Sequence, residues 1–253
     1  MKTVFYREQK YICGDYLDVH IYPVFLSQRG GRSKKKNPTS QAQAKLNEIN
    51  ASLKLTRLLH NNFTSGDMAL YLTYTQDHLP ADEAQAKRNV QNYLRRIKRI
   101  YQKNNIELKY VWITERAKST GRIHHHMILN GGVDRTELEM MWKLGYADSM
   151  SLQFTKDGLA GLANYIIKDK QRESYKRWCA SKNLKRPQPI NNDYKISRKK
   201  AANLVMQAAK EDREEFEKMY PEYIFNDAMP FFSDVNGGYY LFVRMYKKTA
   251  KIL

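Results

Sequence analysis

Apolar and polar side chains alternate between residues 11 and 24, which predicts a half-buried β-strand. Gly14 and Asp15 interrupt the alternation and predict a turn that makes the segment a hairpin. His20 falls on the polar face, where we expect a surface histidine with a hydrogen-bond partner. The apolar face carries Leu17, Val19 and Ile21.

A helical period replaces this alternation in residues 81–104. Asp82 and Glu83 suit the first turn of a helix, because carboxylates there interact favourably with the helix dipole. The opposite face of the predicted helix is rich in Arg and Lys. The apolar stripe consists of Val90, Leu94, Ile97 and Tyr101.

The same patterns predict the remaining elements. Two of the strands are separated only by the short turn 116–121 and must therefore be antiparallel. The chain is thus expected to form an α+β fold, with an antiparallel central sheet and helices packed on it. The predicted strands are 67–75, 106–115, 122–130 and 237–248, and the predicted helices are about 40–60, 134–145, 156–171 and 198–218.

This order suggests a central region with additions at both ends. Residues 1–66 are predicted to hold N-terminal strands, a basic loop and a helix. Residues 67–190 form the core, and residues 191–253 supply a C-terminal helix and strand that complete the same domain.

Charge narrows the range of partners. The chain has 44 Lys and Arg against 26 Asp and Glu, a net charge of +18, which favours a polyanion such as nucleic acid. A generally basic, solvated surface is the alternative, but half of the excess charge lies in residues 170–200. Aromatic side chains interleaved with cations there suggest a groove for single-stranded DNA. Its predicted contacts are Lys176, Arg177, Trp178, Lys182, Lys185 and Arg186.

Other features bear on location. The sequence contains no run of about 18 apolar residues, so a membrane span is not expected. Residues 1–10 contain no apolar signal-peptide core. Cys13 and Cys179 form no disulfide or metal pattern. We therefore expect a protein of the reducing cytoplasm.

Three consecutive histidines lie within the apolar run of residues 122–130. Alternate side chains of a strand share a face, so His124 and His126 point the same way, about 7 Å apart at their backbones. Two such imidazoles are suited to hold one metal ion. His125 points to the opposite, apolar face, where we expect it to be packed or hydrogen-bonded. An accidental polar patch is the alternative for the triplet.

A third, anionic ligand is expected from the preceding strand, which ends at Glu115. If Glu115 pairs with His124, then Ile113 faces His126, and all three polar side chains lie on one side of the sheet. A register shifted by one residue would place Glu115 on the other side. The sequence leaves this choice open.

The residues His124-His125-His126, followed about forty residues later by "YIIK" from Tyr165 to Lys168, resemble the signature of HUH endonucleases. These are the rolling-circle replication initiators (Rep) of phages and plasmids. The segments "LYLTYT", "ITERAKSTGRIHHHMIL" and "SKNLKRP" look like initiators related to the gene II proteins of filamentous phages. The resemblance covers about 67–190, and His125 departs from the usual hydrophobic central residue.

The resemblance implies metal-dependent nicking and joining of single-stranded DNA. Tyr165 would be the nucleophile and would become joined to the 5′ phosphate, leaving a free 3′ hydroxyl to prime a polymerase. Lys168, on the same helix face, would stabilise the phosphate charge. The ion, Mg²⁺ or Mn²⁺, would be held by His124, His126 and Glu115. Tyr175 cannot share the face of Tyr165, so a single catalytic tyrosine is predicted.

The implied partners are the single-stranded origin, a host polymerase and a host helicase, because the chain has no P-loop ATPase motif. A single-tyrosine HUH transposase is a close alternative. A nucleic-acid-binding protein with a structural metal is another. A non-haem iron oxygenase also uses two histidines and a carboxylate, but it accounts neither for the charge nor for Tyr165 and Lys168.

Overall fold

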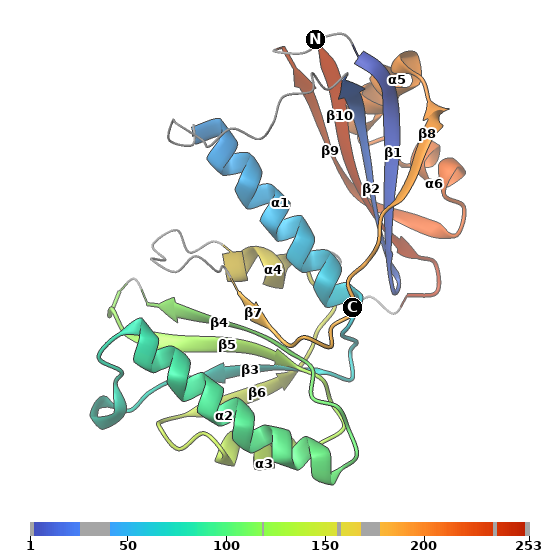
Figure 1. The fold of residues 1–253 in the computed structure, drawn as a ribbon. Coiled ribbons are helices and arrows are strands. Elements are labelled where there is room, and N and C mark those ends of the chain that lie inside the picture. Colours follow the sequence, from blue (N-terminus) through green and yellow to red (C-terminus); the bar gives the residue numbers. More distant parts are fainter. Residues whose placement is uncertain are drawn as a thin grey trace. The chain divides into compact units, whose positions relative to one another are not determined.

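The computed structural model describes residues 3–25, 41–117, 119–155, 158–167, 178–234 and 237–250. Within these ranges it is an α+β protein with two five-stranded antiparallel sheets, and it divides into two compact units (Figure 1). The first unit comprises Met1–Asn61, Thr155–Gly158 and Arg186–Leu253, and the second comprises Asn62–Phe154 and Leu159–Lys185. The predicted fold class is confirmed.

The first unit contains a sheet in the order β8-β1-β2-β10-β9. The predicted hairpin is present: β1 and β2 are joined at Gly14 and Asp15, and Gly14 adopts a φ of 61°, which glycine tolerates without steric cost. Its helix α1 (Gln41–His60) follows β2 in the chain. The strands are β1 (Thr3–Cys13), β2 (Tyr16–Phe25), β8 (Ile190–Ile196), β9 (Tyr223–Ser233) and β10 (Gly238–Lys247).

One face of this sheet packs against α5 (Arg198–Ala209) and α6 (Arg213–Met219). The sequence predicted one helix over 198–218, but the chain breaks between them. Glu211 has a φ of 56°, outside the helical region, and the side chain of Asp212 accepts a hydrogen bond from the backbone of Glu214 to begin α6. The buried core beneath includes Leu17, Val19 and Ile21, as predicted.

The second unit contains a sheet in the order β6-β3-β5-β4-β7. The predicted antiparallel hairpin is present, and of the two registers that the sequence left open the structure has the one in which Glu115 lies opposite His124 and Ile113 lies opposite His126. The strands are β3 (Met68–Leu72), β4 (Tyr110–Arg116), β5 (Ile123–Leu129), β6 (Ala147–Ser151) and β7 (Cys179–Ala180). The helices are η1 (Gln76–His78), α2 (Glu83–Lys103), α3 (Arg135–Met140) and α4 (Ala160–Ile167).

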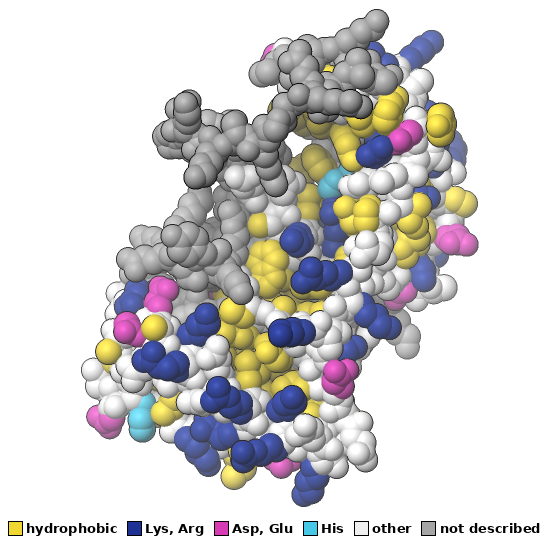
Figure 2. All heavy atoms as spheres, in the orientation of Figure 1, with side chains coloured by type: hydrophobic (Ala, Val, Ile, Leu, Met, Phe, Trp, Pro, Cys, Tyr) yellow, Lys and Arg dark blue, Asp and Glu magenta, His cyan; other side chains and the backbone are white. Residues whose placement is uncertain are grey.

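Helices α2 and α3 pack on one face of the second sheet. The side chain of Asp82 caps α2 by accepting a hydrogen bond from the backbone of Gln85 at 2.6 Å. The predicted apolar stripe of α2 is buried against the alternate residues Trp112 of β4 and Met127 of β5. The basic face of α2 points away from this core, and Figure 2 shows Lys and Arg side chains gathered over it.

Helix α4 lies on the other side of this sheet from α2 (Figure 1). It begins at Ala160, later than the predicted start at residue 156, and residues 168–171 of the predicted helix lie outside the described residues. Ala160 and Ala163 are buried but do not belong to the core on the α2 side. The sheet face on this side includes buried Val111, Ile113 and Ile128. Both faces of the second sheet therefore carry buried apolar residues.

Residues 191–253 were predicted to complete the domain of the core. In the structure their strands β9 and β10 instead join the sheet of β1 and β2, so that the two ends of the chain form one unit. This pairing joins segments far apart in sequence, which local patterns do not reveal. The predicted start of the core at residue 67 lies close to the start of the second unit at Asn62.

Candidate metal centre

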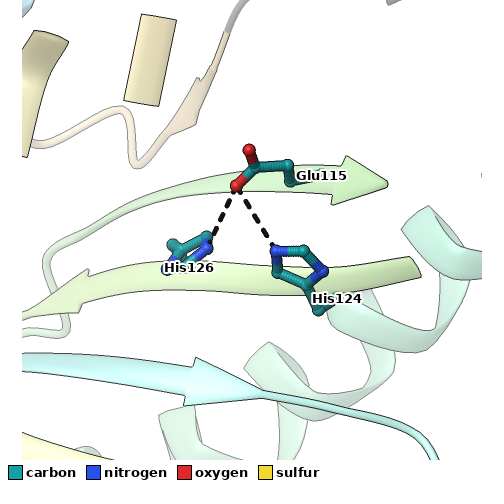
Figure 3. A group of neighbouring side chains, drawn as sticks. All are labelled: Glu115, His124 and His126. Atoms are coloured by element: carbon teal, nitrogen blue, oxygen red, sulfur yellow. Dashed lines mark ion pairs between the residues drawn. The ribbon is translucent and has the colours of Figure 1, made fainter. Parts of the chain in front are cut away.

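The hairpin of β4 and β5 brings three polar side chains together on the face of the second sheet opposite α2. His124 and His126 point from alternate positions of β5, and Glu115 points from the facing position of β4 (Figure 3). The Glu115 Oε2 atom lies 3.3 Å from Nε2 of His124 and 3.2 Å from Nε2 of His126. One ligand atom from each residue lies within 4.8 Å of the other two.

The environment of the three side chains suits a cation. The side chain of His124 is 10% exposed, that of Glu115 is 19% exposed and that of His126 is 20% exposed. The site is therefore largely buried but still accessible to solvent. Glu115 Oε2 is buried and accepts no hydrogen bond among the described residues. A buried carboxylate oxygen without a donor is costly, and a divalent cation would remove that cost. The donor set of two imidazoles and a carboxylate fits a divalent metal ion.

His125 stabilises the strand from the other side of the sheet. It is fully buried, and its two ring nitrogens lie 2.8 Å from the Tyr74 hydroxyl and 2.9 Å from the Thr114 hydroxyl. Burial, assisted by the neighbouring His124 and His126, lowers the pKa of His125 to about 3. The ring is therefore a neutral structural group at physiological pH, which confirms the prediction that it is packed and hydrogen-bonded.

Tyr71 is a neighbour of the site that sequence reasoning missed. It lies on β3 opposite His126, and its ring centre is 5.2 Å from that of His124 and 4.8 Å from that of His126. Burial, and then the charge of Glu115, raises the pKa of its phenol. The alternation of "LYLTY" could have indicated a polar-face tyrosine, but only the pairing of β3 with β5 places it beside the imidazoles.

The structure describes the other predicted catalytic residue positions only in part or not at all. Tyr165 belongs to α4, on the same side of the second sheet as the three polar side chains, but its side chain lies outside the described part of the structure. Lys168, Lys176 and Arg177 also lie outside the described residues. The catalytic roles of Tyr165 and Lys168 stay predictions.

Four residues of the predicted DNA groove are described. Trp178 is half-buried directly before β7, and three cations after it are exposed. The backbone of Lys185 forms two hydrogen bonds with the Asn62 side chain, which holds this segment against the second unit. The DNA contacts themselves stay predictions. The exposed cations are Lys182, Lys185 and Arg186.

None of the helices in the described ranges combines the length and the hydropathy needed to cross a bilayer.

Residues 67–170 match the family model for replication-associated proteins of the ORF2 and gene II protein type. The matched segment contains Glu115, His124, His126 and Tyr165. The match confirms the resemblance to gene II-type replication initiators over this part of the chain, and it supports a replication-associated protein. Comparison of the chain with curated proteins and with solved structures gave no match.

Proposed function

We propose that this chain initiates rolling-circle replication by nicking and rejoining single-stranded DNA through Tyr165. The observation that carries the proposal is the meeting of Glu115, His124 and His126 on one sheet face, within a segment that matches replication-associated proteins. A role in replication agrees with the net charge of +18, which suits a polyanionic substrate.

The proposed reaction is a transesterification at one phosphate of the DNA backbone. The Tyr165 phenol loses its proton, and its oxygen attacks the phosphorus. A bond forms between that oxygen and the phosphorus, and the bond to the 3′ oxygen breaks. The 3′ oxygen takes up a proton, so the products are a 5′-phosphotyrosine and a free 3′ hydroxyl, and the reverse reaction rejoins the strand without ATP.

Different residues of the chain would have different roles in this reaction. Glu115, His124 and His126 would hold Mg²⁺ or Mn²⁺, which when bound polarises a phosphate oxygen and lowers the cost of its developing charge. Lys168, three residues after Tyr165, would add a positive charge beside the phosphate. A phenol with an ordinary pKa of about 10 reacts poorly at neutral pH, so these positive charges are essential to the proposal.

Covalent trapping tests this proposal directly. The full chain is incubated with Mn²⁺ and an end-labelled pool of single-stranded DNA of random sequence, and adducts are resolved on a denaturing gel. We expect a labelled protein–DNA adduct that depends on the metal and is absent for Tyr165→Phe. Tyr146→Phe is the matched control, because Tyr146 is 76% exposed and lies in the same unit but outside the proposed site.

Two outcomes would contradict the proposal. One is an adduct that persists in Tyr165→Phe, which would place the nucleophile elsewhere. The other is wild-type protein that binds Mn²⁺ and single-stranded DNA yet forms no adduct with any member of the pool. That second outcome would favour a binding protein with a structural metal.

A further inference from the structure

Helix α2 exposes a continuous basic face on the side of the second sheet away from the candidate metal centre. Its buried stripe faces the core, and no exposed position after Glu83 carries an acidic side chain. The exposed cations of this face, which we call the α2 basic face, are Lys87, Arg88, Arg95, Lys98, Arg99 and Lys103.

The charge of the α2 basic face is not neutralised within the described part of the chain. None of its six cations forms an ion pair there. Some arginines of the first unit are paired, such as Arg7 with Asp193 and Arg244 with Asp227. The six cations of the α2 basic face therefore keep a positive charge that can interact with a ligand.

This arrangement costs the helix stability. Arg95 and Arg99 are four residues apart, as are Arg99 and Lys103, and like charges at that spacing repel each other along a helix. The buried stripe, which includes Val90 and Ile97, holds the helix in place despite this repulsion. A polyanion bound along the face would relieve it.

The length and chemistry of the face indicate which polyanion. From Lys87 to Lys103 the helix rises about 24 Å, at about 1.5 Å per residue, so the cations can reach several successive phosphates. The exposed positions carry no aromatic ring on which an unpaired base could stack. Long cationic side chains without stacking partners are suited to phosphates of a regular duplex rather than to single strands.

We propose that the α2 basic face binds the backbone of double-stranded DNA, on the side of the second sheet opposite the candidate metal centre. The choice of DNA rests on the match to replication-associated proteins. The binding itself goes beyond the proposed nicking, which acts on a single strand at the other face. One unit would thus hold a duplex on one side of its sheet while the other side handles an unpaired strand.

The test compares two triple variants of the full chain. Arg88→Gln, Arg95→Gln and Arg99→Gln together remove three charges from the centre of the α2 basic face. Lys199→Gln, Lys210→Gln and Lys248→Gln remove three charges from exposed positions of the first unit and serve as the matched control. Binding to a labelled duplex of about 20 base pairs is measured by anisotropy at several salt concentrations, without added metal.

We expect the α2 variant to bind the duplex at least about 30-fold more weakly at moderate salt, with the salt slope reduced by about 2 to 3, since each lost phosphate contact lowers it by about 0.9. The control variant should lose less than about threefold. Nicking of a short single-stranded oligonucleotide should be unchanged in the α2 variant. Thermal unfolding confirms that both variants are folded.

Equal losses in the two variants would overturn the proposal, because they would show that only net charge matters. A larger loss for single-stranded than for duplex DNA would also overturn it. The outcome is independent of the nicking proposal: duplex binding through α2 can hold in a protein that forms no tyrosine adduct, and adduct formation can hold where duplex binding fails.

Discussion

Each of the two sheets carries a cluster in which a carboxylate meets histidine nitrogens. In the second unit, Glu115 faces His124 and His126, which alternate along β5. In the first unit, Asp18 and His20 alternate along β2, and Arg57 of α1 joins them. The Arg57 Nε atom donates to Asp18 Oδ2 at 2.5 Å, and His20 Nε2 lies 3.2 Å from Asp18 Oδ1.

The difference lies in what balances the carboxylate. Asp18 is fully buried, and burial by itself raises its pKa, but the hydrogen bond and charge of His20 and the charge and hydrogen bond of Arg57 outweigh burial and lower it. The guanidinium supplies a permanent positive charge to this cluster. Asp18 Oδ1, like Glu115 Oε2, accepts no hydrogen bond among the described residues, so the two clusters differ in their permanent charge and not in this oxygen. Within the described part of the chain, the ion-pair partners of Glu115 are the imidazoles of His124 and His126, and imidazoles supply lone pairs to a metal ion when they are neutral.

The two clusters show that a carboxylate beside a histidine on one face of a sheet does not by itself indicate a metal site. The third member of each cluster determines whether the cluster is a structural ion pair or a candidate metal centre. An arginine makes the cluster a structural ion pair, and a second histidine makes it a candidate metal centre. His20, which the sequence analysis expected at the surface, is instead buried at 8% exposure within the structural cluster.

The largest effect should come from removing both imidazoles of the candidate metal centre. For His124→Ala with His126→Ala, we expect nicking to fall by at least about a thousandfold, because the ion that stabilises the developing phosphate charge is lost. Titration calorimetry should show no Mn²⁺ binding. His20→Asn, which alters the other cluster, should leave Mn²⁺ binding intact, and loss of binding in that variant would erase the distinction between the clusters.

Removing the arginine of the structural cluster should destabilise the protein without touching the metal. Arg57→Met leaves Asp18 buried without its permanent countercharge, and we expect a loss of about 3 kcal/mol in the free energy of unfolding, measured in urea. Adding Asp18→Asn should restore part of that loss, because the buried charge is then gone. A loss below about 1 kcal/mol for Arg57→Met would mean that the cluster contributes little.

The buried histidine between the two metal-facing ones should matter for stability more than for metal binding. His125→Phe removes the hydrogen bonds to Tyr74 and Thr114, and we expect a loss of about 2 kcal/mol in thermal or urea unfolding. Mn²⁺ affinity should change by less than about tenfold, since the substituted ring lies on the other face. A complete loss of Mn²⁺ binding in a folded variant would contradict this separation of the faces.

The smallest effect, measured per pH unit, should be the pH dependence of stability caused by His60. This buried histidine stacks on Tyr16 in the first unit. Burial, and then the charge of Arg244, lowers its pKa to about 3 from 6.5. Between these values the unfolded chain binds a proton that the folded chain does not, so stability is present above pH 6.5 and falls as the pH drops toward 3.

The slope attributable to His60 is about 1.4 kcal/mol per pH unit within that range. His60→Phe keeps an aromatic ring and cannot be protonated, so its unfolding free energy should fall less steeply with acid than that of the wild type. The measurement is urea unfolding at several pH values from 7 to 4. Parallel curves for the two proteins would show that His60 is protonated equally in the folded and unfolded states.

The sequence predicted the elements whose patterns are complete within themselves. The long helix α2 has a cap and a full apolar stripe, and the short turn between β4 and β5 predicted an antiparallel hairpin whose register the structure then determined. That register is what makes Glu115, His124 and His126 meet. The shared face of His124 and His126 was predictable because both lie on one local strand, whereas the placement of Glu115 depended on the register.

Most of the strands that were missed lie at sheet edges, whereas residues 3–10 of β1, which were also missed, lie between β8 and β2. β6, β8 and β9 each have one neighbouring strand and expose many side chains, so their sequences lack a clear apolar alternation. β8 is held by distant contacts such as the pair of Arg7 with Asp193. Such strands are specified by their partners, and a local reading of the sequence does not contain the partner.

The hairpin of β4 and β5 also limits how this chain can vary. Its turn reverses through Gly121 at a φ of 67°, and most surface turns accept an added residue at little cost. Here one extra residue within the pairing would rotate Glu115 to the far face and dismantle the ligand set. The free energy of binding the proposed ion would therefore also stabilise this register, and the ion affinity of a variant would report on the alignment of the two strands.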